Sequence, residues 1–169
     1  RGVKLIADVK LLVTEEQRDL LLRTLERANQ ACNPISRVAW QHKTFSQFRL
    51  HKLVYYDVRE TFGLPAQMVV RCIAKVADAY QRDKRTGRTF SARGSIAYDD
   101  RIVGWRLSNS SVSIWTLDGR IDVPFAAGER QHDLLPTRQG ESDLVYRNGK
   151  FYLHATCTAQ EPLPDDPND

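Results

Sequence analysis

The chain has 169 residues, of which 41% are hydrophobic and 27% are charged, and its formal net charge at pH 7 is +4. This length and apolar content exclude a disordered composition, because they suffice to bury a core. No stretch approaches the roughly 18 consecutive apolar residues of a membrane span, and the charged, alternating N-terminal residues are not typical of a signal peptide. We therefore expect a cytoplasmic protein without a membrane partner.

The cysteines and the distribution of charge further limit the kinds of protein that this sequence can encode. Cys32, Cys72 and Cys157 lie far apart and form no CxxC pair, which predicts reduced, buried thiols and no zinc site. Residues 82–93 are strongly basic, whereas residues 161–169 hold acids and no base. Because the sequence lacks an initiator Met and ends in a proline-rich acidic run, we expect it to be a fragment of a longer protein.

The first part of the chain predicts a strand followed by a helix. Residues 3–13 alternate apolar and polar side chains, as in a half-buried strand. Thr14 and Gln17 then form a capping-box pattern, and apolar residues at helical spacing follow. We expect this helix to end at Asn33 and Pro34, because proline lacks the amide hydrogen that a continuing helix needs. Residues 35–45 would then form a connector.

Two more helices are predicted before residue 87. The second covers about residues 46–62, and the third covers residues 64–80, with Pro65 in its first turn. Three helices with short connectors should pack as a bundle. The buried side of the second helix is predicted to be Leu50, Leu53, Val54, Tyr55 and Val58, and that of the third Val69, Cys72, Ile73, Val76, Ala77 and Tyr80.

After Gly87 the pattern changes to short β-rich runs, at about residues 95–98, 102–107, 112–117, 120–125, 144–147 and 151–159. Asp118-Gly119 and Asn148-Gly149 are typical of tight hairpins, and residues 128–135 predict a short helix or turn. The prediction is an α+β fold: a small antiparallel β-barrel, of the oligonucleotide-binding kind, with an inserted bundle of about three helices. The barrel would comprise residues 1–13 and 87–159, the insertion residues 14–86, and an acidic linker residues 160–169.

The sequence favours a binding module over an enzyme. It has no glycine-rich phosphate loop, nucleophile elbow or zinc-protease helix motif. Asp99 and Asp100 favour a turn that caps or forms salt bridges, and Cys157 has no neighbouring general base. Two alternatives stay open: a protein-interaction module whose bundle forms a homodimer, and a small enzyme with Asp99, Asp100 or Glu141 as its carboxylates.

Basic and aromatic residues are interleaved in the helical part, as in proteins that stack rings on bases and neutralise phosphates. Gln67 and Arg71, near the positive end of the third helix, have groups that can read base edges. The base-stacking candidates are Trp40, Phe45 and Tyr56, although Trp40, Phe45 and Phe48 could instead fill the junction between bundle and barrel. The phosphate-binding candidates are Arg49, Lys52, Arg59, Lys75, Arg82, Lys84, Arg85, Arg88 and Arg93.

Six segments spread over nearly the whole chain carry a family resemblance. They are residues 53–67 (LVYYDVRETFGLPAQ), 74–80 (AKVADAY), 95–100 (SIAYDD), 112–120 (VSIWTLDGR), 140–145 (GESDLV) and 149–156 (GKFYLHAT). In this order they resemble the N-terminal part of the TnpB-like (OrfB) proteins. These transposon-encoded proteins are RNA-guided DNA nucleases and relatives of the type V CRISPR effectors.

The resemblance implies a wedge-type barrel interrupted by a helical recognition domain. Such a unit holds guide RNA and the guide–target heteroduplex, and reads a short motif in double-stranded target DNA. The RuvC-like nuclease, with its divalent metal and a zinc ribbon, would follow residues 160–169. No catalytic residue, metal or other cofactor is therefore expected in this chain.

The resemblance also implies a prokaryotic, nucleoid-associated protein and indicates where the motif would be read. A DNA-recognition unit of a cleavage-dead guided repressor is the alternative within the same family. By position in the family pattern, the motif-reading candidates are Lys43, Thr44, Gln67, Arg71, Tyr98 and Asp99.

Overall fold

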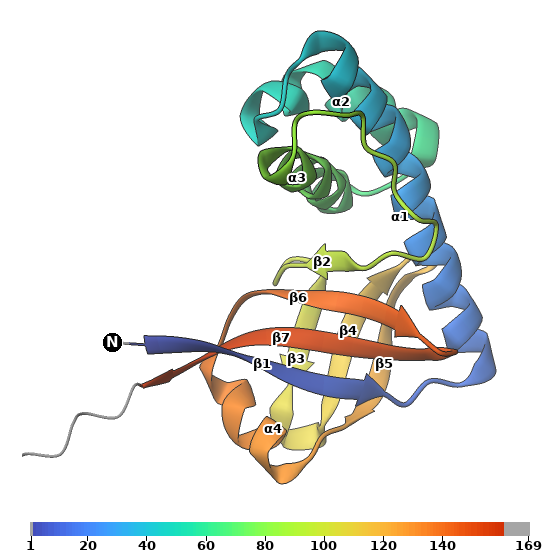
Figure 1. Ribbon diagram of the computed structural model, residues 1–169. Helices are drawn as coiled ribbons and strands as arrows, with labels where there is room; N and C mark the ends of the chain where they lie inside the picture. Colours follow the sequence, from blue (N-terminus) through green and yellow to red (C-terminus); the bar gives the residue numbers. More distant parts are fainter. Residues whose placement is uncertain (1, 161–169) are drawn as a thin grey trace, which may run out of the picture.

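The computed structural model describes residues 2–160, so the predicted acidic linker lies outside the described residues except for Gln160. The chain forms a nearly closed antiparallel sheet of seven strands, with a bundle of helices beside it (Figure 1). The strand order is β2-β6-β7-β1-β5-β4-β3. The α+β class and the barrel-like antiparallel sheet agree with the sequence prediction.

The first strand lies in the middle of the sheet. β1 (Gly2–Leu11) pairs along most of its length with β7 (Lys150–Gln160), and at its end with β5 (Gly119–Ala126). The three long helices follow β1 directly and precede β2 (Ile96–Tyr98), the strand on the side of the sheet facing the bundle (Figure 1). They therefore form an insertion between two strands of one sheet.

Helix α1 (Glu15–His42) begins with the predicted capping box but is much longer than predicted. The expected end at Asn33 and Pro34 is wrong, because Pro34 lies inside the helix. An internal proline costs about 3 kcal/mol. Buried side chains just beyond Pro34 offset that cost: Ile35 is fully buried, and burying such a side chain contributes about 1.5–3 kcal/mol.

Helices α2 (Gln47–Phe62) and α3 (Ala66–Arg82) agree closely with their predicted ranges. Ser46 caps α2, and Gly63 ends it in the left-handed conformation with φ 61°. The predicted apolar stripe of α3 is buried throughout. On α2, however, Leu53 is exposed and Tyr55 only half-buried, because α1 and α3 cover the narrower face formed by Leu50, Val54 and Val58.

The remaining strands complete the sheet with small corrections. β6 (Arg138–Arg147) begins six residues before its predicted start, because a β-bulge between Arg138 and Ser142 interrupts the alternation. The β6–β7 turn is Asn148-Gly149 as predicted, whereas the β4–β5 turn is Leu117-Asp118, with Gly119 already in the strand. The remaining strands are β3 (Val103–Arg106) and β4 (Ser111–Thr116), and the predicted short helix or turn is helix α4 (Glu129–Leu134). Two 3-10 helices cover Leu107–Asn109 and Leu135–Thr137.

Tyr80 joins α3 to α1 and to the loop that follows α3. Its hydroxyl oxygen lies 2.8 Å from Ser36 Oγ and accepts from the Arg88 amide at 2.9 Å. Ser36 Oγ also donates to the Arg88 carbonyl at 2.6 Å. Ser36 and Tyr80 are buried, so these groups have no water to replace a lost partner.

We predict that Tyr80→Phe lowers the free energy of unfolding by about 1–3 kcal/mol, because the Arg88 amide and Ser36 lose a buried partner. Urea unfolding monitored by circular dichroism measures this change. Tyr56→Phe is the matched control, since Tyr56 is exposed, and it should leave the midpoint unchanged. Equal midpoints for Tyr80→Phe and the wild type would contradict the assignment.

Candidate nucleic-acid interface

A cluster of polar side chains joins the start of α3 to the barrel. Gln67 donates from Nε2 to Asp99 Oδ2 and accepts at Oε1 from Arg101, 3.0 Å away. Arg71, about one turn further along α3, donates to Glu141 at 2.7 Å and lies 3.8 Å from Asp99. The fold therefore brings together Gln67, Arg71 and Asp99, three of the predicted motif-reading residues, from two segments remote in sequence.

The turn after β2 positions Asp99 for this contact. Asp99 Oδ1 accepts from the Arg101 amide at 3.0 Å, and its backbone carbonyl accepts from two amides that follow. Such Asx geometry stabilises a tight turn and leaves the second carboxylate oxygen free to face α3. Asp100 forms a salt bridge with Arg138 at 2.7 Å. The interpretation of Asp99 and Asp100 as a capping and salt-bridging turn agrees with this geometry.

Gln67 and Arg71 differ in what they can still bind. A glutamine amide has two N–H groups and two acceptor lone pairs, so Gln67 keeps one of each after bonding Asp99 and Arg101. A donor beside an acceptor matches the edge of adenine in the major groove. The Arg71 side chain is 12% exposed and is neutralised by Glu141. Arg71 therefore acts first as a link between α3 and the barrel.

Tyr98 does not belong to this surface. Its side chain is fully buried, and its hydroxyl donates to the carbonyl of Trp115 at 3.0 Å. Burial raises its pKa well above the usual value for tyrosine, so the hydroxyl stays protonated. The assignment of Tyr98 to DNA reading is corrected, because the alternation of β2 turns this side chain into the barrel core.

The segment around Lys43 lies at the other end of α3. The rings of Phe45 and Trp40 lie 4.8 and 6.3 Å from that of Tyr80, near the C-terminus of α3. Tyr80 is thirteen residues after Gln67, which is about 20 Å along a helix. Trp40 and Phe45 thus pack within the bundle and do not fill its junction with the barrel. Lys43, whose Nζ lies 3.0 Å from the Trp40 ring centroid, and Thr44 do not join the Gln67 cluster.

The basic loop after α3 is partly neutralised by neighbouring acids. Arg85 and Arg88 approach Asp83 at 3.1 and 3.8 Å, and Arg93 lies 3.4 Å from Glu26. Hydrogen bonds from Arg85 lower the pKa of Asp83, which therefore stays ionised. The Arg85 side chain is nevertheless exposed, as are the predicted phosphate-binding residues Arg82 and Lys84.

Lys75 points inward, contrary to its predicted role in phosphate binding. Its ammonium donates to Asn29 Oδ1 at 2.6 Å and to the carbonyl of Ser95 at 2.8 Å. Asn29 is buried and also donates to the carbonyls of Ala92 and Gly94. Lys75 and Asn29 therefore hold the segment that enters β2 against the bundle.

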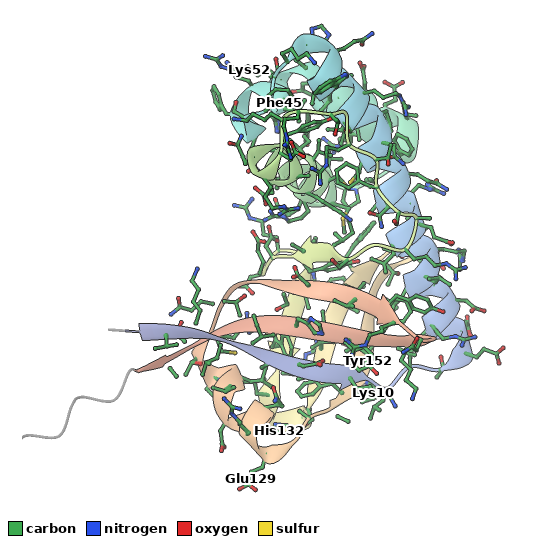
Figure 2. All side chains as sticks on the ribbon, in the orientation of Figure 1. Lys10, Phe45, Lys52, Glu129, His132 and Tyr152 are labelled. Atoms are coloured by element: carbon green, nitrogen blue, oxygen red, sulfur yellow. The ribbon has the colours of Figure 1, made fainter. Side chains whose placement is uncertain are left out.

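The outer face of α2 carries the remaining predicted residues. Arg49, Lys52, Tyr56 and Arg59 are all exposed, and Lys52 lies on the outer part of the bundle (Figure 2). Within residues 2–160, no salt bridge involves the three basic side chains. This face is therefore a second candidate surface, separate from the Gln67 cluster.

Two further residues belong to these surfaces, although neither is among the predicted site residues. Arg101 follows Asp99 and Asp100 directly, and its proximity to Gln67 arises only when β2 packs below α3. For Phe48 the sequence leaves two interpretations open, a ring that stacks on bases and a ring that fills the junction, and the second is wrong because the side chain is 71% exposed. Its position, four residues before Lys52 and eight before Tyr56, places it on the same helical face and was the available signal.

A scan against protein-family models and a search of curated proteins find no match to this chain. The TnpB-like resemblance thus stays a prediction from the six segments. Within residues 2–160, no group of three or more His, Cys, Asp or Glu side chains is placed to hold a metal ion. None of the helices there is long and apolar enough to cross a membrane. The three cysteines are free and buried, as predicted.

We predict that Lys75→Met lowers the free energy of unfolding by about 1–3 kcal/mol at neutral pH, because the buried amide oxygen of Asn29 loses its donor and the carbonyl of Ser95 loses a hydrogen bond. Chemical unfolding measures the loss. Lys84→Met, at an exposed site, is the control and should have no effect. A Lys75→Met protein as stable as the wild type would contradict the anchoring role.

The difference in the free energy of unfolding between wild type and Lys75→Met should also depend on pH. Burial lowers the pKa of Lys75, so between that lowered value and 10.5 the unfolded chain binds more protons than the folded one. The contribution of Lys75 to stability therefore rises with pH across this window. We expect the stability difference between wild type and Lys75→Met to widen from pH 8 toward pH 10. A difference that narrows would contradict this.

Proposed function

We propose that this chain is the nucleic-acid-recognition part of a TnpB-like RNA-guided DNA nuclease, or of a cleavage-dead relative. In this role it binds guide RNA and the guide–target heteroduplex, and reads a short motif in duplex DNA. The helical insertion in a barrel-like sheet supports the proposal, because it is the architecture that the family resemblance implies. The oligonucleotide-binding and wedge character of the barrel is part of the same proposal.

One observation carries the proposal: the meeting of Gln67 and Asp99. Both were selected as motif-reading candidates from separate segments, and their side chains are hydrogen-bonded to each other. The Gln67 amide is held between Asp99 and Arg101, which reduces the entropy that it would lose on binding a base. A held amide with a free donor and a free acceptor is suited to a base edge.

The basic side chains supply affinity without sequence choice. Arg82, at the end of α3, and Lys84 and Arg85, on the loop after it, are exposed and can contact phosphates. Such contacts position a nucleic acid, whereas contacts to base edges select its sequence. In this proposal the chain itself does not cleave DNA, and the nuclease belongs to another part of the parent protein.

We predict salt-dependent binding of the 169-residue chain to duplex DNA and to structured RNA at micromolar protein. If about three phosphates are neutralised, raising the salt from 50 to 200 mM should weaken duplex binding roughly 40-fold. Fluorescence anisotropy with labelled nucleic acids measures both affinities. Absence of binding, or binding that does not respond to salt, would refute the proposed function.

We also predict that Gln67→Ala and Arg85→Ala act differently. Selection from a randomised duplex library should show a base preference for the wild type that Gln67→Ala reduces by about 5- to 150-fold. Arg85→Ala should weaken binding to all sequences alike, since its contact would be to the backbone. Gln67→Glu is a second variant of nearly the same shape, and it should lose the preference because it removes the amide donor. Equal behaviour of Gln67→Ala and Arg85→Ala would remove the assignment of specificity.

A further inference from the structure

Helix α2 exposes two aromatic rings that lie outside the buried core. Phe48 is 71% exposed and Tyr56 is 79% exposed, the highest values among the exposed large apolar side chains of the described residues. The helix is anchored by Leu50, Val54 and Val58 on its opposite face, and Tyr56 packs edge-on against Tyr55 of the same helix, so neither ring is needed to hold α2 in the bundle. Exposed rings gathered on one helix face indicate an interaction site.

The charge of this face limits what can bind there. At about 100° per residue, Phe48, Arg49, Lys52, Tyr56 and Arg59 fall within an arc of roughly 100°. Asp57 and Glu60, the acids of α2, lie outside this arc. A second copy of the chain, meeting this face through the same face, would bring like charges together. The charge of Arg49, Lys52 and Arg59, unpaired within residues 2–160, instead complements an anionic occupant.

The rings distinguish an unpaired strand from a duplex. Bases in a duplex are stacked on each other, so their faces are hidden from a protein side chain, whereas unpaired bases can stack on exposed rings. Phe48 and Tyr56 are eight residues apart, or about 12 Å along the helix. At about 3.4 Å per stacked nucleotide this spans three to four nucleotides, so each ring would take a different base.

The surroundings of Phe48 fit a base and its phosphate. An open hollow of about 530 Å³ is lined by Gln47, Phe48, His51 and Lys52. The Lys52 ammonium lies over one face of the Phe48 ring, 4.4 Å from the ring centroid, so a base would stack on the opposite face with a positive charge close by. Gln47 and His51 add groups that can hydrogen-bond a base edge.

We propose that the outer face of α2 binds an unpaired stretch of single-stranded nucleic acid. Phe48 and Tyr56 stack on separate bases, and Arg49, Lys52 and Arg59 contact the phosphates between and beside them. This site rests on the proposed function only in that the chain binds nucleic acid, and it lies apart from the Gln67 cluster that would read duplex DNA. Figure 2 shows Lys52 on the part of the bundle farthest from the barrel.

The test uses the whole chain and labelled uridine and thymidine oligonucleotides of about 15 nucleotides, a length within reach of one binding site. Removing a stacking ring should weaken binding by about 5- to 150-fold. Phe48→Ala and Tyr56→Ala should each show this loss, and Phe48→Tyr and Tyr56→Phe should bind as the wild type does. Phe48→Leu and Tyr56→Leu should bind as weakly as the alanine variants, because leucine is apolar but has no aromatic face. Leu53→Ala, an exposed apolar position outside the arc, is the control and should bind normally.

The outcomes separate this site from the proposed function. Loss of oligonucleotide binding in Phe48→Ala/Tyr56→Ala, with duplex affinity and base preference unchanged, supports the site. If the double alanine variant loses binding to the uridine oligonucleotide, the strand held is RNA. If it loses binding to the thymidine oligonucleotide alone, the strand held is DNA. Wild-type protein that binds duplex DNA but neither oligonucleotide overturns the α2 site and leaves the proposed function standing. Protein that binds no nucleic acid overturns both. Leucine variants that bind like the wild type, or a dimer by light scattering that the double alanine variant loses, overturn the stacking assignment.

Discussion

The antiparallel pairing of β1 with β7 is the constraint on which the rest of the structure depends. It runs from Gly2 opposite Gln160 to Lys10 opposite Tyr152, and so joins the two ends of the described chain. Contacts between residues so distant in sequence carry a loop-closure cost, which the long ladder and its buried face must offset. The helices and strands that lie between β1 and β7 in the sequence must therefore fit into one barrel-like sheet and its insertion. The bundle must leave and re-enter the sheet between β1 and β2.

The segment that leads from the bundle into β2, and the turn after β2, carry the side-chain contacts that fix the bundle to the barrel. Asn29 and Lys75 hold the segment entering β2 against α1 and α3, and Gln67 and Arg71 contact the turn after β2 and the bulged part of β6. Partly buried charges need partners: Arg71 has carboxylates on the barrel side, and Lys75 has the side chain of Asn29 and the carbonyl of Ser95. A base bound by Gln67 would therefore lie beside the junction, where the orientation of the bundle is held.

The basic residues divide into two groups with different consequences. Arg71, Arg88 and Arg93 are paired with acids, so their charge serves mainly to hold the fold. The basic side chains of the α2 face have no such pairing within residues 2–160 and lie beside exposed rings. Net charge does not distinguish these groups, although the α2 face, like the exposed Arg82 and Lys84, has charge to offer to a ligand at little structural cost.

The sequence by itself determined the features that depend on near neighbours. The capping box at Thr14, the apolar stripe of α3 and the Asn148-Gly149 turn all arise from residues a few positions apart. The tertiary structure decided the rest: the continuation of α1 through Pro34, the burial of Tyr98, the inward direction of Lys75 and the contact of Gln67 with Asp99. Each of these depends on a partner tens of residues away, whose position follows only from packing of the whole chain. Phe48 illustrates the difference, since its residue type favours burial, and only the packing of α2 leaves its ring exposed.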